Sequence, residues 1–210
     1  MNDVQHIGKH GDEVAAAWMI RNAVYVPPRT TLLDVACGKG RHTRYFALRG
    51  AYVTAVDRDG GGLQALATLP NVSTEQRDLE NYPWPYAEHS FDTVLVCNYL
   101  WRPSASALVA TVKPGGLLLY ETFMIGQERF GKPTRPEFLL RPNELLQWTQ
   151  GTFRVIAFQQ QHEIGPDGKP FAMKQKIAAV KLDGPIKSPD VSTESAQAMT
   201  AEAATEPTSP

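Results

Sequence analysis

Carboxylates and glycines stand at the ends of short apolar runs in the first half of the chain. Asp34 lies within the run "LLDVA", and Gly38 and Gly40 follow it in the turn "CGKG". Asp57 ends the next run, "AYVTAVD", and Asp78 follows the run "VSTEQ". A glycine turn between a strand and a helix lets the backbone approach a nucleotide, and a strand-end carboxylate can accept both hydroxyls of a ribose. The spacing therefore predicts a site for a nucleotide-like cofactor.

The residues around these runs predict alternating strands and helices. The expected strands are 31–36, 51–57, 72–76, 91–98 and 117–123, and the expected helices are 12–25, 41–49, 62–69, 104–112 and 142–149. The first helix places Val14 one turn before Trp18, Gly50 stands where a left-handed cap is expected, and 113–116 predicts a tight turn. Such alternation implies a parallel sheet covered by helices on both faces.

The pattern changes after residue 150. Two strand-like segments, 153–164 and 171–182, are joined by the short loop "GPDGKP", which is typical of a hairpin and hence of antiparallel pairing. The expected fold class is α/β, with a Rossmann-like, doubly wound, mostly parallel seven-stranded sheet that ends in an antiparallel β-hairpin.

Three segments of different character divide the chain. Residues 1–29 are expected to form an N-terminal helix and linker, and residues 30–182 the main domain. Residues 183–210 contain no aromatic residue and are rich in Ala, Ser, Thr, Glu and Pro. Because such a segment cannot bury enough surface to offset the entropy of ordering, we expect a disordered tail.

Composition narrows the classes of function. The 210 residues carry a formal net charge of −1, so no strong positive field is available to attract a nucleic-acid backbone. No apolar run reaches the length of a membrane span, and the polar N-terminus is unlike a secretory signal. Two cysteines and scattered histidines predict no metal site. The expected protein is cytoplasmic and has neither a nucleic acid nor a membrane as its partner.

Two cofactor classes are compatible with the first glycine turn. A dinucleotide site has the pattern Gly-x-Gly-x-x-Gly, but the third glycine position is occupied by Thr43. A carboxylate at Asp34 would repel a diphosphate and favour a sulfonium or ammonium group. Asp57 can hold the ribose of NAD or of S-adenosylmethionine and does not discriminate. The residues favour a sulfonium cofactor, and NAD is the alternative.

The order of the motifs resembles that of class I S-adenosylmethionine-dependent methyltransferases. The segments that carry the likeness are "LLDVACGKGRHT", "VTAVDRD", "RDLE", "FDTVLVCNYLWRP" and "VKPGGLLLYETF". Bacterial small-molecule enzymes of the tellurite-resistance and thiopurine-methyltransferase type are the most similar, over about residues 12–182. The resemblance implies S-adenosyl-L-methionine as the cofactor and transfer of a methyl group to a small-molecule acceptor.

Carried over position by position, the resemblance also implies a set of cofactor-binding residues. They are Asp34, Ala36, Gly38 and Gly40 around the methionine part, Asp57 at the ribose, Arg58, Asp78 and Leu79 around the adenine, and the backbone of Asn98 near the sulfonium. Ala36 departs from many relatives, which have glycine at this position.

Residues after the fourth strand are the candidates for the transfer site. Tyr99 and Arg102 are predicted to position the substrate, because in-line methyl transfer needs alignment in a dry pocket and a base only if the acceptor must lose a proton. The long connection 123–141 mixes phenylalanines with basic residues. It favours a lid over a small anionic or aromatic acceptor, or alternatively a structural clasp.

Other functions stay open at this point. One is a NAD-dependent oxidoreductase, and another is a non-catalytic protein that binds S-adenosylmethionine. A methyltransferase acting on RNA or protein is disfavoured because the chain has neither a basic surface pattern nor an additional recognition domain.

Overall fold

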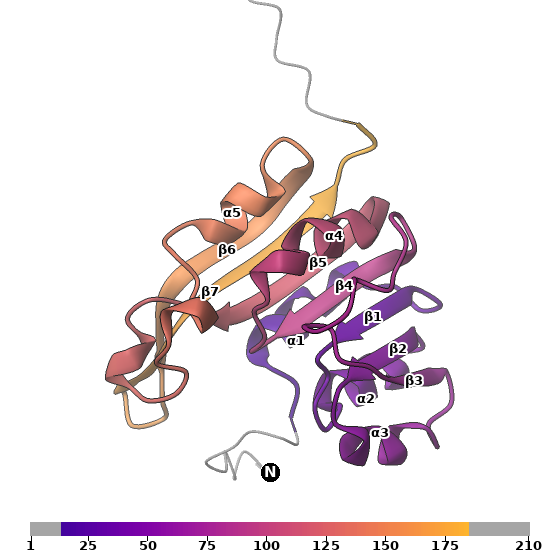
Figure 1. The fold of residues 1–210 in the computed structure, drawn as a ribbon, viewed down its shortest axis with the longest axis horizontal. Coiled ribbons are helices and arrows are strands. Elements are labelled where there is room, and N and C mark those ends of the chain that lie inside the picture. Colours follow the sequence, from indigo (N-terminus) through magenta and orange to yellow (C-terminus); the bar gives the residue numbers. More distant parts are fainter. Residues whose placement is uncertain (1–13, 185–210) are drawn as a thin grey trace, which may run out of the picture.

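Seven strands form one sheet in the computed structural model, which describes residues 14–184 (Figure 1). The strands are β1 (Thr31–Val35), β2 (Tyr52–Asp57), β3 (Val72–Gln76), β4 (Phe91–Cys97), β5 (Val112–Phe123), β6 (Phe153–Ile164) and β7 (Pro170–Lys181). The α-helices are α1 (Ala17–Asn22), α2 (Arg41–Leu48), α3 (Gly60–Leu66), α4 (Ala105–Thr111) and α5 (Glu144–Thr149). Short 3-10 turns are η1 (Ala23–Tyr25), η2 (Arg102–Ser104), η3 (Gln127–Arg129) and η4 (Pro136–Phe138).

The pairing of the strands follows the predicted topology. The order in the sheet is β3-β2-β1-β4-β5-β7-β6. The first five strands pair in parallel, and β7 pairs antiparallel with both β5 and β6. The predicted mostly parallel sheet with a terminal antiparallel hairpin is confirmed. Strand order reverses between β1 and β4, and ligands of open α/β sheets bind beyond the carboxyl ends of the strands at such a point.

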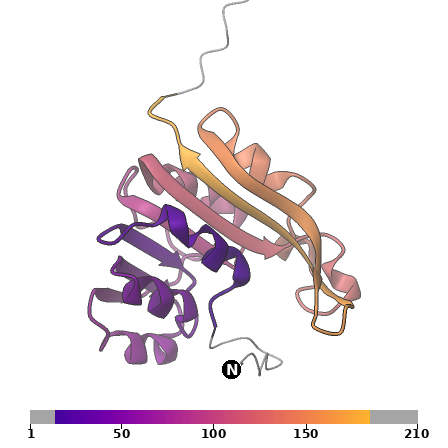
Figure 2. The same cartoon turned by 180° about the vertical axis from the view of Figure 1, so that it is seen from behind.

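Helices cover both faces of the sheet. Figure 1 shows α4 and α5 in front of it, and Figure 2 shows α1 and α2 on the opposite face. On the first face Leu108 and Leu145 pack into a core cluster with inward side chains of the central strands. On the other face Trp18 and Phe46 pack with Leu119. Because strand side chains alternate between the two covered faces, the central strands are apolar along most of their length.

The first helix is shorter than the predicted range of 12–25. The backbone N–H of Ala16 donates to Nε2 of His42 (3.2 Å), and Ala16 has extended dihedral angles (φ −58°, ψ 140°). The helix therefore begins only after this residue, and residues 12 and 13 lie outside the described range. Val14 precedes the helix and is 67% exposed, so the predicted helical turn between Val14 and Trp18 is wrong. Trp18 itself is buried against the sheet.

The fifth strand begins earlier than predicted. It includes residues 113–116, expected to be a turn, because Val112 already pairs with Phe91 and the ladder resumes after an irregularity. Gly116 lies so close to the carbonyl oxygen of Asp92 that an added Cβ would approach it to 2.7 Å. The predicted turn is therefore a bulge within one long strand.

The ends of the other helices lie within three residues of their predicted positions. Gly50 has the predicted left-handed conformation (φ +88°), and its N–H donates to the carbonyl of Ala47 after α2. No helix within residues 14–184 is long and apolar enough to cross a membrane. The predicted disordered tail lies outside the described residues, apart from 183 and 184.

Candidate cofactor and acceptor sites

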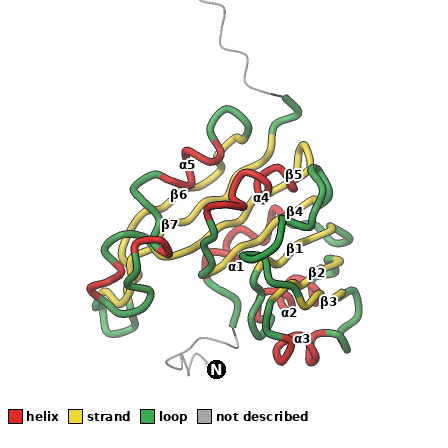
Figure 3. Tube along the Cα trace, in the orientation of Figure 1, coloured by secondary structure: helices red, strands yellow, loops and turns green. Residues whose placement is uncertain are grey.

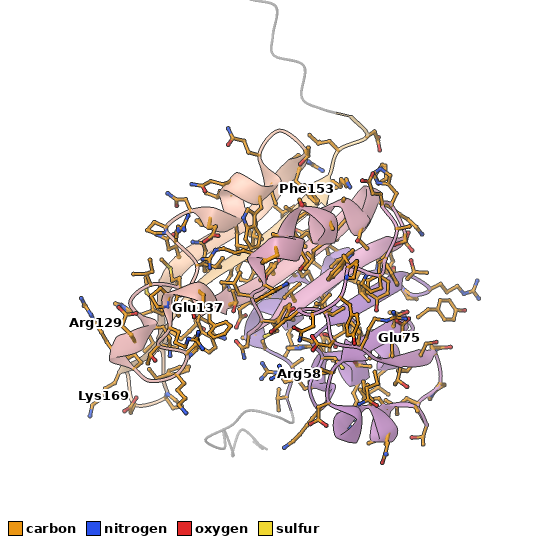
Figure 4. All side chains as sticks on the ribbon, viewed as in Figure 1. Arg58, Glu75, Arg129, Glu137, Phe153 and Lys169 are labelled. Atoms are coloured by element: carbon orange, nitrogen blue, oxygen red, sulfur yellow. The ribbon has the colours of Figure 1, made fainter. Side chains whose placement is uncertain are left out.

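The carboxyl ends of the parallel strands enclose a cavity of about 260 Å³. It is lined by Ala36, Asp57, Arg58, Arg77, Asp78, Leu79, Glu80 and Tyr99. All of these except Arg77 and Glu80 were named from the sequence. They lie at or just after the ends of β1, β2, β3 and β4, which meet at one edge of the sheet. Figure 4 marks this edge with Arg58.

Two glycines shape the first turn in different ways. Gly38 and Gly40 have φ of +58° and +74°, a region that favours glycine. A Cβ on Gly38 would meet no described atom within 4 Å, and the Gly38 N–H donates to Oδ2 of Asp57 (2.8 Å). A Cβ on Gly40 would lie 2.3 Å from Cδ1 of Leu66. Gly38 therefore leaves an open face for a ligand, whereas Gly40 lets the turn pack against α3.

Asp34 does not line the cavity. Its side chain is 1% exposed, and Oδ2 accepts a hydrogen bond from the Thr43 hydroxyl of α2 (2.6 Å). Burial raises the pKa of Asp34 to about 7, although hydrogen bonds from Thr43 oppose the rise. The carboxyl group thus occupies the first turn of α2, where a dinucleotide fold binds diphosphate. Asp34 is therefore placed to hold the turn, and its predicted contact with the cofactor stays a prediction.

The raised pKa of Asp34 predicts a pH-dependent stability. The folded chain holds this proton more tightly than the unfolded chain, whose carboxyl has the ordinary pKa of 3.8, so stability falls as the pH rises towards 7. We expect the free energy of unfolding of the wild type, relative to Asp34→Asn, to fall by roughly 2–3 kcal/mol between pH 5 and pH 8. Urea unfolding at both pH values measures this difference.

His42 is a second buried group that makes the stability depend on pH. Burial, followed by the charge of Arg41, lowers its pKa to about 3, so the contribution of His42 has the opposite dependence on pH. Because His42 is present in both proteins, its contribution cancels in the difference. Parallel stability curves for wild type and Asp34→Asn would show that Asp34 ionises normally in the folded chain.

Asp78 fixes the loop that follows β3. Its Oδ1 accepts the N–H of Glu80 (2.8 Å), and its Oδ2 accepts Nδ2–H of Asn81 (2.6 Å). The hydrogen bond from Asn81 is the main reason that the pKa of Asp78 lies below its ordinary value. Asp78 is therefore a turn-forming aspartate whose loop, with Leu79, also forms one wall of the cavity.

Tyr99 stands between this cavity and a neighbouring one. Its carbonyl accepts the hydroxyl of Tyr120 (2.9 Å), which anchors the loop after β4. The Tyr99 hydroxyl is buried and has no hydrogen-bond partner in the described part of the chain. Burial, reinforced by the carboxylates of Glu80 and Asp78, raises the pKa of Tyr99, so it remains a neutral phenol. It is suited to donate a hydrogen bond to a ligand and unsuited to act as a base.

The neighbouring cavity has a volume of about 540 Å³. It is lined by Glu80, Asn98, Tyr99, Leu100, Thr122, Phe123, Lys132, Pro133, Thr134, Arg135 and Phe138. Glu80 and Tyr99 line both cavities, so the two are parts of one cleft. Segment 123–141 supplies over half of the lining; Figure 1 shows it beyond the arrowhead of β5, and Figure 3 shows it as loop interrupted by short helical turns.

The lining from segment 123–141 combines aromatic rings with positive charge. Phe123 and Phe138 face the cavity together with Lys132 and Arg135. The guanidinium of Arg135 lies 5.3 Å from the centre of the Phe138 ring and is ion-paired with Glu137, which Figure 4 labels. Lys132 is exposed and has no ion pair among residues 14–184. The other aromatic and basic side chains of the segment, Phe130, Arg129 and Arg141, do not line the cavity.

Arg102 does not line the cavity either. Its Nε and one terminal nitrogen donate to the two carboxylate oxygens of Glu144 (2.6 and 2.8 Å). The guanidinium also donates to the carbonyls of Glu137 and Leu139 (2.7 Å each). These contacts connect η2 to α5 and to the end of segment 123–141. Arg102 is thus a brace for the wall of the larger cavity, and the predicted substrate contact is not supported by its geometry.

Asn98 lies at the end of β4 and lines the larger cavity. It has φ +55°, a left-handed conformation that asparagine tolerates better than most residues. Its Oδ1 accepts a hydrogen bond from Nζ of Lys174 (2.7 Å), a residue of β7 that the sequence interpretation missed. A signal was present: Lys174 and Lys176 are two residues apart in the strand-like run "FAMKQKIAAV", so both belong to one face of the strand.

The smaller cavity meets the chemical requirements of an adenosine group carrying a sulfonium. The buried Tyr99 hydroxyl lacks a partner among residues 14–184, the face of Gly38 is open, and Asp57 offers carboxylate oxygens at a strand end. Small-molecule sites typically measure about 300–1,000 Å³, so the smaller cavity alone suits part of such a ligand and the whole cleft suits a ligand plus an acceptor.

Comparisons with known proteins agree with this geometry. Residues 32–116 match the family model described as a methyltransferase domain. Similar solved structures include a putative S-adenosylmethionine-dependent methyltransferase from Listeria monocytogenes (16% identity, TM-score 0.60, covering 79% of this chain and 98% of that one). TehB from Haemophilus influenzae is 20% identical with a TM-score of 0.62, over 85% of this chain and 64% of TehB.

A third structure, 1,6-didemethyltoxoflavin-N1-methyltransferase from Burkholderia thailandensis, was solved with 1,6-didemethyltoxoflavin and S-adenosylhomocysteine bound. It is 21% identical, with a TM-score of 0.57 over 80% of this chain and 77% of that one. No curated protein matches the chain.

The seven-stranded sheet and its strand order give the chain the fold of these S-adenosylmethionine-dependent methyltransferase structures. Residues 32–116 match a methyltransferase domain, and together with the structural neighbours this match supports an S-adenosylmethionine-dependent methyltransferase. The predictions of this enzyme class and of S-adenosyl-L-methionine as its cofactor are confirmed.

Proposed function

We propose that the smaller cavity binds the adenosine part of S-adenosylmethionine and that the larger one binds a small-molecule methyl acceptor. In this proposal Asp57 accepts the ribose hydroxyls, and Asp78 with Leu79 contacts the adenine edge. Arg58 flanks the adenine, Ala36 and Gly38 lie along the methionine part, and Asp34 and Gly40 hold the turn. The observation that carries the proposal is the shared wall of the two cavities, formed by Tyr99 and Glu80.

The chemistry requires little from the protein beyond alignment. When bound, the cofactor supplies an electrophilic methyl group on a sulfonium sulfur. The chain's own contribution is to hold an acceptor in line with that group and to exclude water. Tyr99 stays protonated because burial raises its pKa, so it orients ligands as a hydrogen-bond donor. The lone pair that attacks the methyl group belongs to the acceptor, and Tyr99 does not act as a base for it.

The lining of the larger cavity supports an aromatic acceptor that carries an anionic oxygen. Phe123 and Phe138 offer faces for a flat ring, and Lys132 and Arg135 offer positive charge at the rim. Glu80 is the one carboxylate among the described residues of the lining, and it lies on the wall shared with the cofactor cavity. The small acceptor bound in the Burkholderia structure supports a small molecule here as well.

Calorimetric titration of the wild-type protein tests the proposal. We expect S-adenosylmethionine and S-adenosylhomocysteine to bind, and NAD not to bind, because Asp34 occupies the helix end that a diphosphate needs and carboxylates line the cavity. Tight binding of NAD, or no binding of S-adenosylhomocysteine, would overturn the assignment of the smaller cavity. Turnover with a panel of small acceptors then separates an enzyme from a non-catalytic binding protein.

A further inference from the structure

Three charged side chains are buried at the carboxyl end of β5 and in β7. Glu121, Lys174 and Lys176 are 3%, 8% and 5% exposed. Lysine and glutamate are almost never this buried unless they are paired. In the register of the two strands Glu121 lies opposite Lys176, and Phe123 lies opposite Lys174. The four side chains therefore stand on one face of the sheet.

Lys174 contacts three groups at once. Its Nζ lies 2.5 Å from Oε1 of Glu121, donates to Oδ1 of Asn98 (2.7 Å) and lies 4.9 Å from the centre of the Phe123 ring. Two of these partners, Asn98 and Phe123, line the larger cavity. The pair formed by Lys174 and Glu121 thus lies directly behind the proposed acceptor site.

The contact with Lys174 fixes the orientation of the Asn98 amide. An ammonium group can only donate hydrogen bonds, so the atom of Asn98 that faces it is the carbonyl oxygen. The amide nitrogen then points away from Lys174, and it has no hydrogen-bond partner within residues 14–184. Asn98 is exposed and lines the cavity, so its two N–H groups are available to a ligand there.

We propose that Lys174 and Glu121 are a positioning pair that turns the amide N–H groups of Asn98 towards the acceptor, and so selects an aromatic acceptor with an anionic or carbonyl oxygen. This inference rests on the proposed function, because it needs the larger cavity to be the acceptor site. Asn98 touches the acceptor, whereas Lys174 acts through Asn98. Glu121 keeps Lys174 in place: burial alone would raise the pKa of Glu121, but the ammonium groups of Lys174 and Lys176 hold it below its ordinary value.

The neighbouring lysine supplies a matched control. Lys176 is on the same strand and the same face, and it is as deeply buried, but its nearest carboxylate is that of Glu163 (2.7 Å). It lies 3.9 Å from Glu121 and has no contact with Asn98 among the described residues. A purely structural role for buried charge would make the two lysines equivalent, whereas the proposal makes only Lys174 important for the acceptor.

The variants are chosen so that no buried charge is left without a partner. Lys174→Met alone would leave the buried carboxylate of Glu121 without its closest ion-pair partner. Such a loss strongly destabilises a folded protein. We therefore compare Lys174→Met/Glu121→Gln with Lys176→Met/Glu163→Gln. Asn98→Gly removes the amide and tolerates the positive φ of this position. The triple variant combines Asn98→Gly with Lys174→Met/Glu121→Gln.

The experiment is an NMR titration with benzoate as the probe, on protein saturated with S-adenosylhomocysteine. The side-chain amide resonances of Asn98 are assigned by their loss in Asn98→Gly. We expect benzoate to shift them, and we expect its affinity to fall about tenfold in Lys174→Met/Glu121→Gln and in Asn98→Gly. The triple variant should lose no more than either, because both changes remove one interaction. Lys176→Met/Glu163→Gln should bind benzoate within twofold of the wild type.

The outcomes separate this inference from the proposed function. Lys174→Met/Glu121→Gln and Lys176→Met/Glu163→Gln should both bind S-adenosylhomocysteine within twofold of the wild type, since none of these residues lines the smaller cavity. Additive losses in the triple variant, or equal losses in the Lys176 control, would overturn the positioning pair. Failure of benzoate to bind the wild type would overturn the acceptor chemistry while leaving the cofactor site intact. Failure of S-adenosylhomocysteine to bind would instead contradict the proposed function.

Discussion

Replacing Asp57 with alanine is expected to weaken S-adenosylhomocysteine binding by about 100-fold or more. A carboxylate that accepts two ribose hydroxyls makes two charge-assisted hydrogen bonds, and each contributes roughly 1.5–3 kcal/mol. Asp57 also accepts the N–H of Gly38 (2.8 Å) and of Asp59 (2.9 Å), so it shapes the turn beside the ligand. Calorimetric titration of purified Asp57→Ala measures the loss.

Two further variants test whether the loss comes from the carboxylate of Asp57 itself. Asp57→Asn keeps one oxygen acceptor without the charge, and we expect an intermediate loss of about tenfold. Asp59→Ala is the control, because Asp59 caps α3 by accepting the N–H of Gly61 (2.9 Å) and does not line the cavity. It should lower stability by about 1 kcal/mol and leave the affinity within twofold. An unchanged affinity of Asp57→Ala for S-adenosylhomocysteine would show that the ribose does not bind at this end of β2.

The predicted residues that line the smaller cavity share one property: each lies at or just after the end of a parallel strand. Ala36, Asp57, Asp78 and Tyr99 are far apart in the chain, yet they line one cavity. Parallel strands joined by helices end at the same edge of the sheet, so recognising the strands is enough to bring these positions together. No knowledge of side-chain packing is needed for that step.

Side-chain direction is what the sequence could not supply. Asp34 lies on β1 itself, and its carboxyl group turns into the core to meet Thr43 instead of the ligand side. Arg102 follows the same strand as Tyr99, but three carboxylate and carbonyl groups from residues 137–144 engage its guanidinium. Those groups are 35 to 42 residues away in the sequence, so no local pattern around Arg102 predicts the contacts. Loop side chains are placed by tertiary contacts, not by strand order.

Contacts between distant strands were also beyond a local interpretation. Lys174 meets Asn98 across 76 residues, because β7 inserts between β5 and β6. The hairpin was predicted from its own turn, but its neighbour in the sheet depends on the whole topology. Likewise the first helix begins late because the N–H of Ala16 donates to His42, 26 residues further on.

Replacing Arg102 with methionine distinguishes a brace from a substrate contact. Glu144 is buried, with a side chain 7% exposed, and it loses its bidentate partner in this variant. The carbonyls of Glu137 and Leu139 each lose the hydrogen bond that Arg102 donates. Breaking a buried ion pair on one side costs roughly 3–5 kcal/mol, and the partial exposure of Arg102 favours the lower end. We expect urea unfolding to show a loss of about 3 kcal/mol. Benzoate affinity should fall because the cavity wall at Phe138 is no longer held.

The partner variant Arg102→Met/Glu144→Gln completes the argument. It removes the unpaired carboxylate of Glu144, so it should be more stable than Arg102→Met. It should stay less stable than the wild type, because the carbonyls of Glu137 and Leu139 still lack their hydrogen-bond donor. S-adenosylhomocysteine should bind both variants within twofold of the wild type, because Arg102 does not line the smaller cavity. If Arg102→Met lost benzoate binding at full stability, Arg102 would be a direct contact of the acceptor after all. Loss of stability together with loose benzoate binding would instead mean that this arginine builds the acceptor site from behind.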